Sequence, residues 1–157
     1  MARSPVFAKM LSANMQESLK NSLNIEDFGE ETVKGMLEWI YTGTTEIVSE
    51  RAELLLQIAE KYELEGLKED CEGYLVQKLC VENASNMLLL GHLYNAPYLK
   101  RRSTEFIIIN KKEVGKTAGF KELSMKSIYT GVFLGLFLAD HQSIISVLNI
   151  ITDSMNV

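Results

Sequence analysis

Apolar residues recur three and four positions apart from residue 33 to residue 109, and this spacing constrains the fold more than any other feature of the sequence. It is the period of a helix with one buried face. The first run follows Glu30 and Glu31, which favour a helix start, and precedes Gly43, which is suited to a left-handed cap. Its apolar members are Val33, Met36, Leu37 and Ile40. The pattern predicts a helix that ends near Gly43 and buries this face.

Four more runs with this period follow. Ser49 is the predicted N-cap of the second run. Gly66 interrupts the helical pattern only weakly before the third run. Pro97 is expected to end the fourth, because the residue before proline avoids helical geometry. The inward-facing members are Ala52, Leu55, Leu56, Ala59 and Tyr62; Leu67, Cys71, Leu75 and Leu79; Met87, Leu88, Leu90 and Leu93; and Leu99, Ser103 and residues 106–109.

The stretch from Ser4 to Ile25 predicts a short helix, a loop and a strand. Ser4 can cap the helix, Pro5 suits its first position, and the polar residues 12–14 end it. Leu23 and Ile25 alternate with polar residues, as in a strand with one buried face. The whole pattern predicts a mainly α chain of five or six helices with one residual strand.

The loop of this stretch carries an unusual pair. Met15 lies two positions before Glu17, in a segment that is otherwise too polar to form a core. Either Met15 folds back onto its own domain or a partner protein receives it. Spacing alone favours the first alternative.

Charge and composition exclude several classes of function. Residues 1–80 carry 8 basic and 15 acidic side chains, and residues 81–157 carry 8 and 6. The acidic first half is unsuited to nucleic acid, because phosphate binding needs a basic face. The basic clusters at residues 100–102 and 111–112 are interpreted as solvated helix surface. Two cysteines give no disulfide framework, which favours a reducing compartment.

No arrangement of side chains indicates catalysis, a cofactor or a metal. Cys71 and Cys80 are expected to pack as small apolar residues, because His92 lies on a separate predicted helix. The triplet Gly115-Lys116-Thr117 is no phosphate-binding loop, since Asn110 stands where such a loop needs glycine. We therefore predict a surface turn there and a chain that is not an enzyme.

The apolar tail, residues 127–157, has two interpretations. Residues 128–139 form an apolar run of twelve positions, too short for the roughly 20 residues that cross a bilayer. A buried helix is the simpler interpretation, with no membrane contact. The alternative is a segment without an evolved partner surface, whose exposed Phe133, Leu136 and Phe137 would favour aggregation.

Five short motifs occur in one order: SPVF at 4–7, M-x-E at 15–17, WIYTG at 39–43, EKYxLxxLK at 60–68 and VENA at 81–84. In this order and spacing they resemble the second half of a BTB/POZ domain, and most of all the MATH-BTB proteins of the speckle-type POZ class. The resemblance covers about residues 2–110. It implies a partial BTB/POZ domain at 1–80, a BACK-like helical region at 81–126 and a divergent tail at 127–157. Cys80 stands where the family commonly has serine, which makes a poorer helix cap.

The resemblance implies a substrate adaptor of a cullin-3 ubiquitin ligase, active in protein ubiquitination and degradation in the nucleus and cytoplasm. Met15 would enter an apolar pocket of cullin-3, and Glu17 would add a polar contact. Leu11 and Asn14 flank this loop and belong to the same expected site. The helical pair at 83–110 would widen the cullin contact.

The family pattern also includes strands and a helix upstream of SPVF, with most of the dimerisation surface, and a MATH domain that captures substrate. The sequence is therefore expected to be a truncated product, with a weakened homodimer. Two alternatives stay open: a self-associating scaffold or transcriptional co-regulator without cullin binding, and an inactive remnant.

Overall fold

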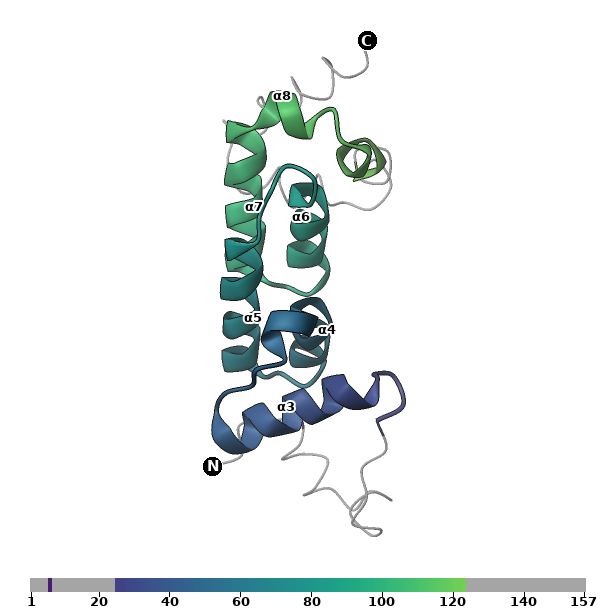
Figure 1. Ribbon diagram of the computed structural model, residues 1–157, viewed down its shortest axis with the longest axis vertical. Helices are drawn as coiled ribbons and strands as arrows, with labels where there is room; N and C mark the ends of the chain where they lie inside the picture. The colour runs from purple at the N-terminus through teal and green to yellow at the C-terminus, as the bar shows by residue number, and fades with distance from the viewer. Residues whose placement is uncertain (1–5, 7–24, 124–157) are drawn as a thin grey trace. The chain divides into compact units, whose positions relative to one another are not determined.

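The computed structural model describes residues 25–123 together with Val6, and element labels follow Figure 1. The described residues are mainly helical and include no strand, which confirms the predicted mainly α fold. Of the predicted strand, Leu23 and Asn24 lie outside the described residues, and Ile25 adopts no strand conformation. The described residues up to Tyr74 form one compact unit, and those from Leu75 form a second.

The first unit is built from α3 (Glu30–Thr42), α4 (Val48–Lys61) and α5 (Glu65–Gln77). Gly43 ends α3 in the left-handed region, with φ of 85°, and its N–H donates to the Trp39 carbonyl over 2.8 Å. Glu30 and Glu31 occupy the first turn of α3, as predicted. Helix start and helix end therefore follow the local signals in the sequence.

The buried face of α3 differs from the predicted one. The helix buries Thr32, Gly35, Met36 and Trp39. Leu37 is 38% exposed, whereas Val33 and Ile40 are half-buried. Of the four residues predicted to face inward, only Met36 is fully buried. Each buried position lies one residue before a predicted one, so the buried face is rotated by about 100° around the helix axis. Threonine and glycine occupy this face together with the two large apolar side chains.

The start of α4 also corrects a prediction. Ser49 is not the N-cap: α4 begins at Val48, and the Ser49 hydroxyl donates to the Glu46 carbonyl over 2.9 Å. Arg51, with φ of −134° and ψ of 31°, separates this opening turn from the rest of the helix. The predicted inward residues of α4 are all buried, namely Ala52, Leu55, Leu56, Ala59 and Tyr62.

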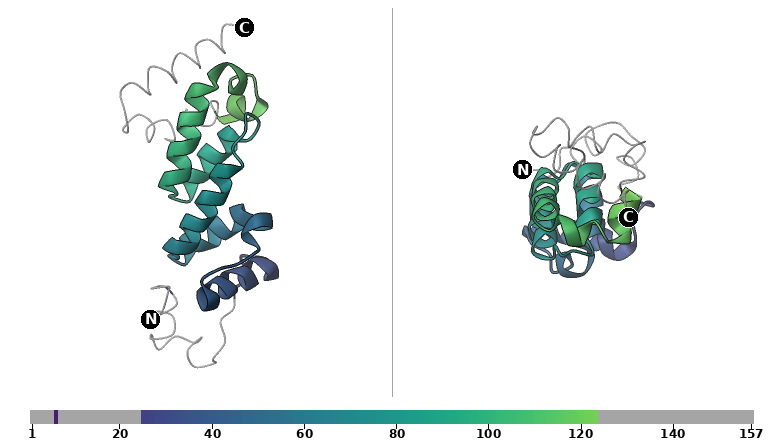
Figure 2. Two further views of the ribbon diagram at one scale, coloured as in Figure 1. Left: turned by 60° about the vertical axis from the view of Figure 1, so that its left-hand side comes forward. Right: turned by 90° about the horizontal axis from the view of Figure 1, so that it is seen from above.

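The second unit contains the hairpin of α6 (Ala84–Leu93) and α7 (Pro97–Ile109), which lie side by side (Figures 1 and 2). Pro97 occupies the first position of α7, and α6 has already ended, as predicted. The hairpin packs closely at Gly91, where an added Cβ would lie 2.7 Å from the Lys100 backbone nitrogen. Glycine is therefore required there by the proximity of α7, not by its own backbone angles.

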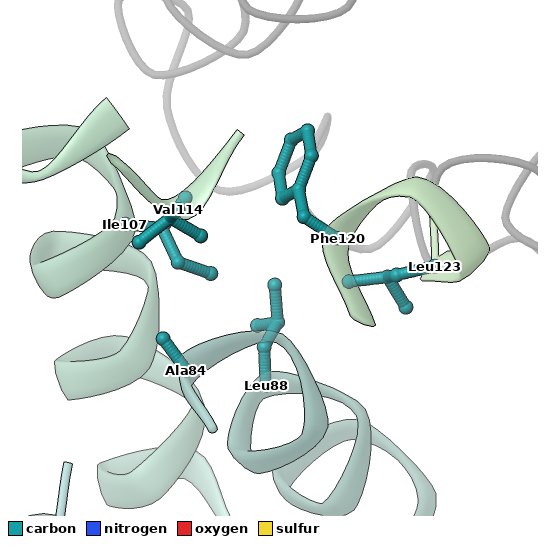
Figure 3. Close-up of a cluster of buried hydrophobic side chains, with 6 residues drawn as sticks. All are labelled: Ala84, Leu88, Ile107, Val114, Phe120 and Leu123. Atoms are coloured by element: carbon teal, nitrogen blue, oxygen red, sulfur yellow. The ribbon is translucent and has the colours of Figure 1, made fainter. Parts of the chain in front are cut away.

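A small apolar core joins this hairpin to the residues that follow it. After α7 come α8 (Lys111–Val114) and a helical segment at 118–123. Phe120 and Leu123 point from that segment toward side chains of α6, α7 and α8 (Figure 3). The buried members of this cluster among the described residues are Ala84, Leu88, Ile107, Val114, Phe120 and Leu123. Between α8 and the 118–123 segment, Lys116 lies exposed in a turn, which confirms the predicted surface turn.

Three residues besides Leu37 were predicted to be inward or packed but are exposed. Leu93 is 58% exposed at the end of α6, and Ile109 is 80% exposed at the end of α7. Cys80 is exposed as well, before α6 begins, where its N–H donates to the Asn83 side chain over 2.8 Å. Leu93 and Ile109 are the last residues of their helices, where periodicity no longer determines which side is buried. Cys80 was assigned from its residue type alone, and it lies outside any helix.

Candidate interaction site

The four residues predicted to bind a partner lie outside the described residues. They are Leu11, Asn14, Met15 and Glu17. The tail at 127–157 and nearly all of the predicted short helix before residue 12 also lie outside them. The candidate interaction site among the described residues is the outward face of α3, which follows this stretch in the chain.

The outward face of α3 is apolar and accessible. Tyr41 is 83% exposed, and Leu37, one helical turn before it, is 38% exposed. Residues four positions apart on a helix are neighbours, so the two side chains share one face. Lys34 lies three positions before Leu37 and forms an ion pair with Glu30 over 2.6 Å. An exposed tyrosine and leucine within a rim of charged groups are typical of a protein contact surface.

Trp39 anchors α3 from the opposite face. Its indole N–H donates to Asp70 Oδ2 over 2.9 Å, and the residue is only 9% exposed. An added Cβ at Gly66 would lie 2.8 Å from Trp39 Cζ2, so α5 comes close enough to the indole ring to require glycine. The three residues fix the rotation of α3 and therefore the direction in which Tyr41 points.

The turn after Tyr41 is held by side chains as well as backbone. The Thr42 hydroxyl donates to the Glu38 carbonyl over 2.8 Å, and the Thr45 hydroxyl donates to Glu38 Oε2 over 2.6 Å. The Thr44 N–H donates to the Thr42 hydroxyl over 3.2 Å. Local polar contacts of this kind order a loop without a core of its own.

Lys68 is a buried cation of the first unit. Its Nζ lies 2.7 Å from Glu60 Oε2 and 3.5 Å from Glu65 Oε1, and its side chain is 5% exposed. Burial acts to lower the pKa of Lys68, but the hydrogen bonds and charges of Glu60 and Glu65 outweigh it and raise the pKa above its ordinary value. The ammonium therefore stays charged at neutral pH and links α4 to α5.

We expect Lys68→Ala to lower the free energy of unfolding by about 2 kcal/mol, since it leaves Glu60 and Glu65 without their shared cation. The loss is smaller than for a fully buried pair because the Glu60 side chain is 34% exposed. Lys34→Ala is the control, because both members of its pair are largely exposed and its removal should have no measurable effect. Urea denaturation measures both, and equal losses would contradict the role of Lys68.

The two cysteines differ in accessibility and chemistry. Cys71 is fully buried, as predicted, and burial together with Asp70 and Glu72 raises the pKa of its thiol to about 12. It is therefore an uncharged packing residue at neutral pH. Over residues 25–123, no group of histidine, cysteine and carboxylate side chains could hold a metal ion. Within the same range, every helix is too short or too polar to span a membrane.

Sequence reasoning missed two residues of this site. Tyr41 belongs to the WIYTG motif, but it was not distinguished as exposed, because nothing in the helical period separates it from Ile40. Asp70 was not identified at all, because it reaches Trp39 across 31 positions of chain. The sequence offers one indirect signal. A buried tryptophan usually needs a hydrogen-bond partner for its N–H, and this chain has a single tryptophan and 24% charged residues that could supply one.

The chain resembles known proteins over half of its length or more. The family profile of the BTB/POZ domain matches residues 1–79, which is half of the chain. "TD and POZ domain-containing protein 2" from Mus musculus is 39% identical over 124 residues, covering 78% of this chain and 34% of that protein. "Protein maternal effect lethal 26" from Caenorhabditis elegans is 38% identical over 124 residues, covering 78% of this chain and 31% of that protein.

The chain thus spans about a third of the length of these two relatives. The match includes α3, α4 and α5, so the exposed face of α3 and its anchor at Trp39 lie inside the matched domain. Domains of this kind are protein-interaction modules. The chain belongs to the BTB/POZ domain family.

Proposed function

We propose that this chain is the cullin-contacting part of a substrate adaptor for a cullin-3 ubiquitin ligase. The observation that carries the proposal is the accessible apolar face of α3, formed by Leu37 and Tyr41 on a helix fixed by Trp39. The BTB/POZ family match supports it, because this domain brings proteins together. The M-x-E motif at 15–17 supports it from the sequence.

The proposed contact combines an apolar anchor with a side chain on an ordered helix. Met15 supplies the anchor, and burying such a side chain contributes about 1.5 to 3 kcal/mol before ordering costs. Glu17 adds a rim contact of less than about 1 kcal/mol. Tyr41 supplies a large side chain with few rotatable bonds on an ordered helix, which is a common composition for an energetic centre of an interface.

The proposal also assigns the chain to one group within the BTB/POZ family. The order of motifs supports a MATH-BTB protein of the speckle-type POZ class, with a BACK-like region in the second unit. In that role the chain presents substrate selected by another domain, carries out no chemical step itself, and is active in nucleus and cytoplasm. The outward face of α3 serves the cullin contact in this role.

We expect Tyr41→Ala to weaken binding to the N-terminal region of cullin-3 about tenfold, which corresponds to about 1.4 kcal/mol. Leu54→Ala is the control: Leu54 is 38% exposed on α4, outside both α3 and the helical pair, and its removal should leave affinity unchanged. Isothermal titration calorimetry measures both. Unchanged affinity in Tyr41→Ala would remove α3 from the contact, and self-association without any cullin binding would favour a scaffold.

A further inference from the structure

The outward face of α7 carries cations between two exposed apolar side chains. Tyr98 is 43% exposed and Ile109 is 80% exposed, and Arg101, Arg102 and Glu105 lie on the same side of the helix. The opposite side is buried through Leu99, Ser103 and Ile107. The eleven positions from Tyr98 to Ile109 correspond to about 16 Å along the helix axis.

The two arginines are held in different ways. The Arg101 guanidinium lies 5.7 Å from the centre of the Tyr98 ring, a cation–π distance that orders the side chain. Arg102 Nη1 lies 2.6 Å from Glu105 Oε2, with both side chains nearly half exposed. Ordered guanidinium groups recognise carboxylates through two parallel hydrogen bonds, at a lower entropic cost than lysine.

The charge of the surrounding unit favours an acidic partner. Residues 75–123 carry 8 basic and 4 acidic side chains, whereas residues 25–74 carry 4 basic and 14 acidic. The positive charge is therefore concentrated in the unit that contains α7, although the whole chain has a net charge of −5. A negatively charged segment would be attracted to this unit and repelled by the other.

We propose that the outward face of α7 docks an acidic, amphipathic helix of a partner protein. The partner places carboxylates against Arg101 and Arg102 and apolar side chains against Tyr98 and Ile109. Glu105 competes with the partner for Arg102, so it limits affinity and favours segments with more than one carboxylate. This surface lies on α7, and the proposal does not depend on cullin binding.

The test uses the full chain and a labelled, alanine-based helical peptide as the probe. The peptide carries phenylalanine and leucine eleven positions apart, with glutamates between them on the same face. Its control has glutamine in place of each glutamate. Fluorescence anisotropy should show saturable binding of the glutamate peptide that weakens with added salt, and at least tenfold weaker binding of the glutamine peptide.

Three variants separate this surface from general charge attraction. Arg101→Glu with Arg102→Glu should weaken binding at least tenfold, whereas Glu105→Gln should strengthen it about threefold by releasing Arg102. Lys116→Glu with Lys121→Glu changes the net charge by the same amount at exposed positions outside α7 and should have little effect. A thermal melt confirms that each variant is folded.

Several results would overturn the proposal. Equal binding of the two peptides, equal loss in both double variants, or no saturable binding would each exclude a specific acidic partner. Self-association of the chain that Arg101→Glu with Arg102→Glu abolishes would identify a second copy as the occupant instead. Weaker binding in Glu105→Gln would show that Glu105 supports the surface rather than competing for it.

Discussion

Replacement of Trp39 by alanine is expected to lower the free energy of unfolding of the first unit by about 3 to 5 kcal/mol. The indole is 9% exposed and lies against α5 at Gly66, so its loss leaves a cavity that the helices cannot close. The change also removes the donor that binds Asp70 over 2.9 Å. Because Trp39 fixes the rotation of α3, the outward face with Tyr41 would lose its defined orientation.

Trp39→Phe is the control that separates volume from hydrogen bonding. It keeps an aromatic ring and removes the indole N–H, and we expect a loss of about 1 to 2 kcal/mol. Trp39 is the only tryptophan, so its replacement removes the fluorescence signal, and circular dichroism must follow urea denaturation instead. A loss below about 1 kcal/mol for Trp39→Ala would show that α3 is held by other contacts.

Gly91→Ala is expected to destabilise the α6–α7 hairpin by about 3 kcal/mol, the upper end for overpacking. The added Cβ would lie 2.7 Å from the nitrogen and 2.8 Å from the Cα of Lys100, and backbone atoms cannot move aside as a flexible side chain can. The two helices must separate, which also disturbs the contacts of neighbouring residues across the hairpin. A lower denaturation midpoint with an unchanged m-value would measure this loss.

Gly73→Ala provides the comparison for Gly91. Gly73 also lies within a helix, but no atom lies within 4 Å of its added Cβ. Alanine favours a helix over glycine by up to about 1 kcal/mol, so this variant should be slightly more stable. If both alanine variants gain stability, α6 and α7 leave room for a side chain at Gly91, and the close approach to Lys100 is contradicted.

Lys68 gives the first unit a defined dependence on pH. The pKa of Lys68 is raised in the folded chain, so the folded state retains its proton to higher pH than the unfolded state. Its contribution to stability is complete below the ordinary lysine pKa and is lost as pH rises through the raised value. The melting temperature of the Lys68→Ala variant should therefore decrease less at alkaline pH than the melting temperature of the natural sequence.

The helices could be predicted from sequence because their period and their end signals are local. Gly43 ends α3 and Pro97 begins α7 as expected, since each residue acts through its own backbone geometry. Which side of a helix is buried depends on its neighbours instead. In α3, the face with Thr32 and Gly35 packs inward, whereas the spacing of apolar residues alone predicts that Leu37 is buried.

The candidate site was less predictable, because its parts are distant in sequence. Trp39 and Asp70 meet across 31 positions, and a charged residue such as Lys68 would be placed at the surface by composition alone. Lys68 on α5 can be buried because it is paired with Glu60 on α4 and with Glu65 one turn earlier on α5. The cullin-contact residues Leu11, Asn14, Met15 and Glu17 rest on the family resemblance and stay a prediction.

Calorimetry of the purified chain with the N-terminal region of cullin-3 tests the central claim most directly, with Met15→Glu beside the natural sequence. Met155→Glu is the control, since it makes the same change at a distant position. The proposed adaptor should bind with micromolar or tighter affinity, lose binding in Met15→Glu and keep it in Met155→Glu. Equal binding by all three chains, or no binding by a chain that melts cooperatively, would contradict it.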